Sequence, residues 1–220
     1  MGILMMLWWL CGCATSDRVD PWEGFNRKVT SFNDGVDVVL LKPLATGYQA
    51  VTPDPVERGI SNVFDNLDEP VTSLNQLLQA KPGRAFNDAT RFVVNSTVGL
   101  LGTIDVATPM GLEKHNEDFG QTFAVWGIGE GPYLVLPFLG PSSPRAALGR
   151  IPDSRLDLLR TIDHVRTRNT IRALSLIDTR VELMGVEKLI SGDRYLFIRD
   201  AYLQRRAYEI ADGDIEDEFF

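Results

Sequence analysis

Apolar residues recur at helical spacing through much of the chain, and this pattern predicts a mostly helical protein. In the clearest stripe, apolar side chains occupy positions i, i+3, i+4 and i+7 and so share one face of a helix. These residues are Ile60, Val63, Phe64 and Leu67. Similar stripes elsewhere predict a set of amphipathic helices, each with one apolar and one polar face.

Three helices are predicted in the first half of the chain, over residues 21–41, 54–78 and 84–98. Asp20 is expected to cap the first helix, with Pro21 at its first helical position. Proline is expected to end that helix after Lys42 and to interrupt the second helix at Pro70.

A different pattern covers residues 119–144, where glycines and aromatic residues are interspersed with prolines. This composition predicts an irregular segment of short extended pieces joined by turns. Helical spacing then returns and predicts a long helix over residues 154–184, capped by Ser154, and a last helix over residues 191–211. Residues 21–211 are therefore predicted to form one mostly α domain.

The first thirteen residues form an uncharged apolar run. The run is too short to span a bilayer, which takes roughly 20 residues, but it matches the apolar core of a secretory signal. It ends in Leu10-Cys11-Gly12-Cys13, which resembles a bacterial lipobox with Cys13 as the residue to be acylated. We therefore predict a signal peptide over residues 1–12 and a lipidated tether over residues 13–20. A buried N-terminal helix is the alternative.

Charge is distributed unevenly along the chain. The net charge of -8 argues against nucleic-acid binding, which needs a basic surface. Residues 14–144 carry a net -7, residues 145–206 carry +5 and residues 207–220 carry -6. The basic stretch is suited to phosphate headgroups or to an acidic partner, or it is ordinary helix-surface charge. Residues 212–220 are predicted to form an acidic tail.

No catalytic or cofactor-binding motif emerges from the sequence. Phosphate-binding GxxxxGK[ST] loops and GxSxG nucleophile elbows are absent. The histidines, His115 and His164, lack ligand-spaced partners, and we interpret His164 as solvated on a charged helix face. Asp68-Glu69 and Glu117-Asp118 are adjacent pairs, which do not establish two carboxylates about 5–10 Å apart across a cleft. We therefore expect no enzyme, no cofactor and no metal site.

Short motifs follow one another in order between residues 17 and 206. They are Asp20-Pro21-Trp22-Glu23-Gly24-Phe25-Asn26-Arg27, Leu67-Asp68-Glu69-Pro70, Asn75-Gln76-Leu77-Leu78-Gln79, Arg91-Phe92-Val93-Val94-Asn95, Phe119-Gly120-Gln121-Thr122, Trp126-Gly127-Ile128-Gly129-Glu130-Gly131-Pro132-Tyr133 and Ala201-Tyr202-Leu203-Gln204-Arg205-Arg206. Behind a lipobox, this series resembles the MlaA (VacJ) lipoprotein family. Two departures are Ala146 after Arg145, where the family usually has an acid, and Arg194 before Tyr195, where it usually has proline. The departures leave the partner of Arg145 open and allow an earlier start of the last helix.

The resemblance implies a lipid-anchored protein on the periplasmic side of the outer membrane; Ala14 after the lipobox agrees with that membrane. It implies a helical ring, embedded in the membrane, whose amphipathic pore removes mislocalised phospholipid from the outer leaflet. A trimeric porin and a soluble periplasmic lipid carrier are the implied partners. The apolar helix faces are compatible with this picture or with an ordinary soluble core. An envelope scaffold bound to porins without transport activity, and a surface lipase, are the alternative functions.

Two segments are candidates for the pore or its gate. The amphipathic segment over residues 25–39 is expected to line or gate the pore, and the glycine cluster over residues 127–131 to shape its wall by close backbone approach. The candidate residues are Phe25, Asn26, Phe32, Asn33, Gly127, Gly129 and Gly131. A plain cluster of turns is the alternative for the glycines.

Overall fold

The computed structural model describes residues 19–214. The predicted signal peptide, the lipobox with Leu10, Cys11, Gly12 and Cys13, and most of the tether and of the acidic tail lie outside the described residues. The elements are α1 (Glu23–Val36), the π-helical turn η2 (Asp37–Leu41), α2 (Lys42–Val51), α3 (Asp54–Leu78), α4 (Pro82–Thr97), η3 (Thr108–Met110), α5 (Phe119–Val125), β1 (Leu134–Leu136), β2 (Gly140–Ser142), α6 (Pro144–Leu156), η4 (Leu158–Thr161), α7 (Val165–Glu187) and α8 (Arg194–Ile210). The mostly helical fold class is confirmed.

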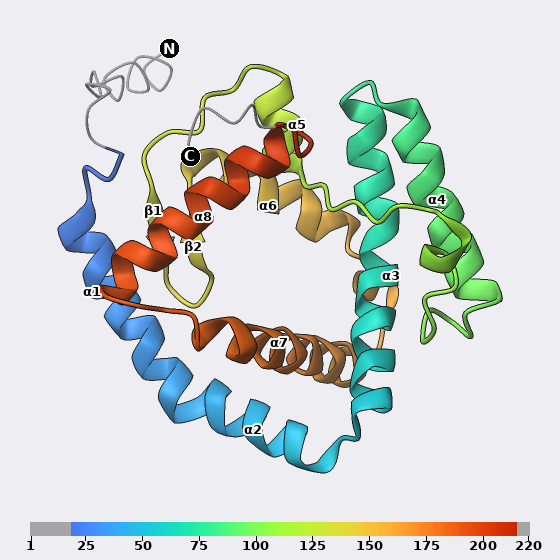
Figure 1. Cartoon of the computed structure of the whole chain (residues 1–220), viewed down its shortest axis with the longest axis horizontal. Helices are drawn as coiled ribbons and strands as arrows, with labels where there is room; N and C mark the ends of the chain where they lie inside the picture. The colour runs from blue at the N-terminus through green and yellow to red at the C-terminus, as the bar shows by residue number, and fades with distance from the viewer. Residues whose placement is uncertain (1–18, 215–220) are drawn as a thin grey trace.

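The elements are arranged as a ring (Figure 1). α1 and α2 follow one side and α3 the next, while α6, α8 and the β1–β2 hairpin complete the circle. α7 lies beside α2 and also packs on α3. α3 and α4 pack together as a helical hairpin, and β1 pairs antiparallel with β2 and contacts α1. The helical ring that the resemblance implied is therefore present.

The first predicted helix does not end at Lys42. α1 continues through the π-helical turn Asp37–Leu41 into α2, which runs on to Val51. The amide of Lys42 donates to the carbonyl of Asp37, five residues back, and this wider turn precedes Pro43, which has no N–H to donate. Pro43 thereby stands in the first turn of α2, where a helix tolerates proline.

Pro70 does not interrupt α3, which is continuous over Asp54–Leu78. Proline in a helix interior costs about 3 kcal/mol, so a compensating interaction is needed. α4 packs along α3, and on either side of Pro70 the α3 residues Asn66, Glu69 and Thr72 are buried. Tertiary packing therefore overrides the local preference of proline.

The glycine- and aromatic-rich segment is only partly extended. Residues 134–142 form the predicted extended pieces as the β1–β2 hairpin, but Phe119–Val125 forms the helix α5. The carboxylate of Asp118 accepts a hydrogen bond from the amide of Gln121 at 2.8 Å and so caps α5. The expectation of an extended segment here was wrong, because a capped turn and packing on α6 outweigh the low helix propensity of the glycine.

A separate helix, α6, occupies residues 144–156, between the predicted irregular segment and the predicted long helix and overlapping the ends of both. Ser143 caps α6 by accepting from the amide of Ala146, and Pro144 stands in its first turn. A Cβ on Gly149 would lie 2.4 Å from the backbone nitrogen of Gly120, so the crossing of α5 and α6 requires glycine at that position. Ser154 lies inside α6 and caps no helix.

Other helices also begin at residues that differ from the prediction. The long helix α7 begins at Val165, because His164 caps it and accepts from the amide of Thr167; His164 is therefore a capping residue. α8 begins at Arg194, not earlier, because Asp193 accepts from the amide of Tyr195 at 2.9 Å and caps it.

The chain buries polar side chains and exposes apolar ones. The buried residues of α3 and α4, apart from Ala85, are polar: Asn66, Glu69, Thr72, Asn75, Gln76, Asp88, Arg91 and Asn95. Several residues of the predicted apolar stripes face outward, with Phe86 76% exposed and Val39 79% exposed, whereas Ile60, Val63, Phe64 and Leu67 are half-buried. Water-soluble domains show the opposite distribution in their helices. These helices therefore leave much apolar surface outside the core, and such a surface is suited to contact with lipid.

Within residues 19–214, no helix combines the length and the apolar character needed to cross a bilayer.

Candidate functional site

A buried ion pair organises the polar interior between α3 and α4. Arg91, which is 2% exposed, donates from Nε to Glu69 Oε1 at 2.7 Å. Its guanidinium also donates to the carbonyl of Leu112 at 2.6 Å and contacts Asp105 at 3.3 Å. Burial raises the pKa of Glu69 to about 7, although Arg91 opposes the shift. The pair holds the helical hairpin and the following loop together.

The histidine and acids considered for catalysis have structural partners. His115 Nδ1 lies 2.6 Å from Oδ1 of the fully buried Asp88. Glu117 accepts from Gln79 at 2.7 Å, and Asp118 accepts two hydrogen bonds from Arg206 in addition to capping α5. Among the described residues, no group of three metal-binding side chains is gathered.

The candidate residues Asn26 and Asn33 attach α1 to the β-hairpin. Asn26 is fully buried; its Nδ2 donates to the carbonyl of Tyr133 at 3.1 Å, and its Oδ1 accepts from the amide of Val135 at 2.9 Å. Seven residues later on the same face, Asn33 Nδ2 donates to the carbonyl of Leu136 at 3.0 Å. Asn33 Oδ1 accepts from the amide of Phe138 at 2.8 Å. The side-chain amides of Asn26 and Asn33 thus form hydrogen bonds to the backbone of the hairpin, as the backbone of a neighbouring β-strand would.

Asp20 joins this attachment, although it does not cap α1 as predicted; Trp22 holds the capping position. Asp20 Oδ1 accepts from Asn26 Nδ2 at 2.9 Å, and its other oxygen accepts from the Tyr195 hydroxyl of α8. Residues at the end of the tether, in α1 and in α8 therefore meet at one point, and the ring is closed there.

The candidate aromatic residues of α1 are surface residues. Phe25 is 55% exposed, and Phe32 packs edge-on against Phe138 at the tip of the hairpin, with ring centroids 5.2 Å apart. The structure thus gathers Asn26, Phe32 and Asn33 at the contact between α1 and the hairpin, while Phe25 stays on the exposed side of α1.

The three candidate glycines differ in their surroundings. Gly127 and Gly131 adopt the left-handed conformation, with φ of +86° and +76°, so the turns at these positions favour glycine. Close approach is found only at Gly131, where an added Cβ would lie 3.0 Å from Pro144 Cγ. A Cβ on Gly129 would meet nothing within 4 Å. Of the three candidate glycines, Gly131 is therefore the one whose identity is explained by close approach to another part of the chain.

Arg145 has partners despite the missing acid after it. Its guanidinium donates to the carbonyl of Ile128 at 2.9 Å and lies 3.6 Å from Glu130. The arginine thereby fixes the glycine-rich loop against α6.

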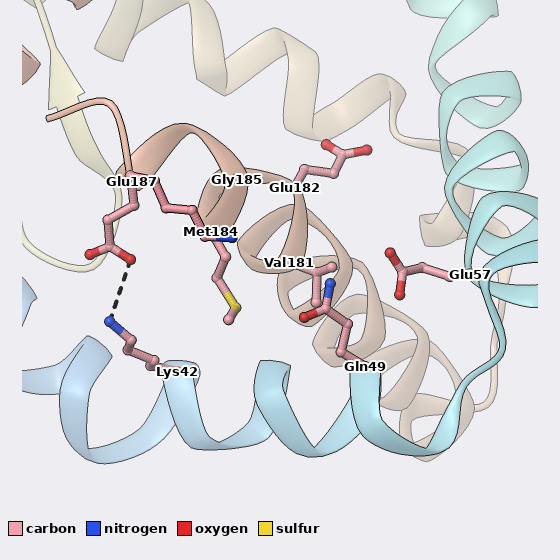
Figure 2. A pocket seen from close by; sticks show the side chains of 9 residues that line it. Lys42, Gln49, Glu57, Val181, Glu182, Met184, Gly185 and Glu187 are labelled. Atoms are coloured by element: carbon pink, nitrogen blue, oxygen red, sulfur yellow. Dashed lines mark hydrogen bonds and ion pairs between the residues drawn. The ribbon is translucent and has the colours of Figure 1, made fainter.

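A cavity of about 580 Å³ opens between α2, α3 and α7 (Figure 2). Charged side chains of both signs line it: Lys42, Glu57, Glu182, Glu187 and Lys188. Glu187 accepts from Arg180 at 2.9 Å and from Arg194 at 3.3 Å, and the bond from Arg180 lowers its pKa below the ordinary value. These residues carry no sequence signal for a shared site, because they are far apart in the chain and share no motif.

The polar interior had a sequence signal that the apolar stripes obscured. Asn66, Glu69, Thr72 and Gln76 follow one another at helical spacing, as do Asp88, Arg91 and Asn95. Each series is a polar stripe on a helix whose other face is apolar. Reading the polar stripe as the buried one would have predicted the contact between α3 and α4.

These features define a ring-shaped helical protein whose α3–α4 hairpin has a polar interior and whose surface exposes many apolar side chains. Residues 18–209 match the family model of the MlaA lipoprotein. The chain belongs to the MlaA lipoprotein family.

Two relatives and one solved structure are similar to most of this chain. The "Intermembrane phospholipid transport system lipoprotein MlaA" of Shigella flexneri is 34% identical over 218 residues, which are 94% of this chain and 86% of that protein. An uncharacterized protein of Rickettsia bellii is 35% identical over 191 residues, 85% of this chain and 75% of that protein. A solved structure, described as the structural basis for maintenance of bacterial outer membrane lipid asymmetry, matches with a TM-score of 0.75 and 33% identity. The match covers 87% of this chain and 98% of that chain.

Proposed function

We propose that this protein removes mislocalised phospholipid from the outer leaflet of the outer membrane and passes it to a soluble periplasmic carrier, maintaining lipid asymmetry. The observation that carries the proposal is the inverted distribution of side chains, polar inside the α3–α4 hairpin and apolar outside. Such a ring is stable in the acyl region of one leaflet while it keeps polar groups away from the lipid tails. Membership of a family with members named as phospholipid-transport lipoproteins supports it.

A polar passage through an apolar ring lowers the main barrier to lipid movement. Exposing acyl chains to water costs about 0.8 kcal/mol per CH₂, so two long chains cost roughly 20 kcal/mol or more. A route that offers polar contacts to the headgroup and apolar contacts to the tails removes most of this cost without covalent catalysis. A lipase at the same surface would instead release free fatty acid, which is directly measurable.

We propose that Phe25, Phe32 and Asn33 line or gate this route, and that the glycine loop forms part of its wall. The fully buried Asn26 belongs to this gate by holding α1 on the hairpin. Gly129 offers the cleanest test, because it lies in open space and, unlike Gly127 and Gly131, does not adopt the left-handed conformation. The variant Gly129→Trp is expected to block the route and raise outer-leaflet phospholipid towards the level of cells that lack the gene.

Two matched variants control for this test. Gly129→Ala adds little volume, and Gly83→Trp places the same bulk at a glycine of α4 that also has open space around it. Both are expected to keep outer-leaflet phospholipid at the wild-type level. A well-expressed Gly129→Trp protein with normal outer-leaflet phospholipid would remove Gly129 from the route.

The anchor and the partners are part of the same proposal. Lipidation at Cys13 would hold the protein at the periplasmic face of the outer membrane, since two or more acyl chains anchor stably. Mass spectrometry of the mature N-terminus is expected to find an acylated Cys13, and globomycin to block its maturation. An unmodified N-terminus that retains residues 1–12 would exclude the anchor.

A trimeric porin and a soluble lipid carrier are the proposed partners, and a porin-bound scaffold without transport activity is the second candidate. A transfer assay with the purified porin complex and the carrier separates them. Movement of phospholipid to the carrier supports transport, whereas a stable complex that moves no lipid supports the scaffold.

A further inference from the structure

The cavity between α2, α3 and α7 has a basic end. Lys42 from the start of α2 and Lys188 from the end of α7 line it there. The acid at this end, Glu187, is already engaged by Arg180 and Arg194, and Lys42 Nζ lies 3.5 Å from it. In the described part of the chain, Lys188 forms no ion pair. This end therefore presents two ammonium groups: Lys188, which has no ion pair within residues 19–214, and Lys42, which shares Glu187 with two arginines.

The opposite end of the same cavity is acidic. Glu57 from α3 and Glu182 from α7 line it, and neither forms an ion pair within residues 19–214. Asp178, which is buried, adds a further carboxyl one helical turn before Glu182. Burial, and then the charges of Asp178 and Asp65, raise the pKa of Glu182, although Lys114 opposes the shift.

The two ends face one another across the cavity. Figure 2 shows Lys42 and Glu187 on one side and Glu57 on the other, with Met184 between them. A ligand that satisfies both ends must carry a negative group near the lysines and a positive group near the glutamates. Polar groups placed in this way fix the orientation of a ligand.

We propose that this cavity binds the headgroup of a zwitterionic phospholipid, with its phosphate at Lys42 and Lys188 and its ammonium at Glu57 and Glu182. The proposal rests on the proposed function and adds a headgroup preference to it. An anionic headgroup satisfies only the lysines and meets like charge at the glutamates, so it binds more weakly.

Lipid exchange with mixed vesicles tests the preference. The full-length lipoprotein in detergent is incubated with vesicles of equimolar phosphatidylethanolamine and phosphatidylglycerol with identical acyl chains, re-isolated, and its bound lipid measured by mass spectrometry. The wild type is expected to retain phosphatidylethanolamine in roughly fivefold excess, the order expected of one partly exposed ion pair. The double variant Glu57→Gln, Glu182→Gln is expected to bring the ratio close to one.

Further variants separate the two ends and control for surface charge. Lys42→Gln with Lys188→Gln is expected to lower the binding of both lipids, because both carry the phosphate. Glu113→Gln removes an acid that is 87% exposed and does not line the cavity, and it is expected to leave the ratio at the wild-type value. Thermal unfolding of each variant verifies that its fold is retained.

The outcomes distinguish the preference from the proposed function. A wild type that retains both lipids in the vesicle ratio, or a glutamine double variant that keeps the fivefold excess, overturns the headgroup preference and leaves transport standing. A wild type that retains no phospholipid overturns both.

Discussion

Replacing Arg91 by methionine is expected to destabilise the protein by about 3–5 kcal/mol, the cost of leaving a buried charge without its partner. Methionine keeps much of the length of the side chain but removes every donor to Glu69, Leu112 and Asp105. The loss is measured as a lower midpoint of thermal or denaturant unfolding, followed by the helical circular dichroism signal in detergent.

The destabilisation is expected to depend on pH. The pKa of Glu69 in the folded protein is raised to about 7, above its ordinary value of 4.5. A carboxyl group whose pKa is raised by folding stabilises the folded protein most at pH values below its pKa in the unfolded chain. This stabilisation is lost as the pH rises through the pKa that the group has in the folded protein. Without Arg91, which lowers the pKa of Glu69, that pKa rises further. Glu69 is then neutral at about pH 5 at no cost, whereas at about pH 8 the variant must either protonate it or bury a lone anion. The loss should therefore be clearly smaller at the lower pH.

Two variants control for this result. Glu69→Gln combined with Arg91→Met removes both charges and is expected to be more stable at about pH 8 than Arg91→Met alone. Arg166→Met changes an exposed arginine of α7 and is expected to alter stability by about 0.5 kcal/mol or less. An Arg91→Met variant with the same loss at both pH values would contradict the assigned role of Glu69.

Replacing Asn26 by aspartate is expected to destabilise the protein by about 3 kcal/mol and to weaken lipid removal with it. Aspartate still accepts from the amide of Val135, but it places a carboxylate oxygen where Nδ2 donates to Asp20 and to the carbonyl of Tyr133. Two attractive contacts of a fully buried group thus become repulsive. The unfolding midpoint and outer-leaflet phospholipid are the two measurements.

The geometry supplies a matched control and a rescue for this variant. Asn33→Asp makes the same change at the partly exposed end of the attachment, where water screens the charge, and its effect is expected to be smaller. Asp20→Asn in the Asn26→Asp background removes one of the two repulsions and is expected to restore part of the stability. An Asn26→Asp protein as stable as the wild type would show that the attachment does not hold the ring.

The helices and the family were predictable from local pattern, whereas several boundaries were not. Apolar periodicity located α3, α4, α7 and α8, because helix formation on one face depends on residues three and four apart. Pro70 remained inside α3, and α6 formed across Pro152, because packing partners distant in sequence compensate for lost backbone bonds. The two predicted helix caps failed. The carboxylate of Asp20 accepts hydrogen bonds from Asn26 and Tyr195 instead of capping α1, and Ser154 lies inside α6.

The candidate site was predicted as a region but not as a set of contacts. The motif around Asn26 marked α1, yet its role in attaching the hairpin depends on Tyr133 and Val135, more than a hundred residues away. The charged cavity had no sequence signal, since it forms only when α2, α3 and α7 meet.

The sequence by itself determined that the chain is a set of amphipathic helices of the MlaA lipoprotein family behind a lipobox-like segment. Only the tertiary structure decided which face of α3 and α4 is buried, and it is the polar face. Periodicity reports that a helix has two unlike faces but carries no information about the medium outside it. The buried ion pair of Glu69 with Arg91 and the exposed apolar side chains show that the polar face is inside and that much of the apolar surface is outside, a surface suited to contact with lipid.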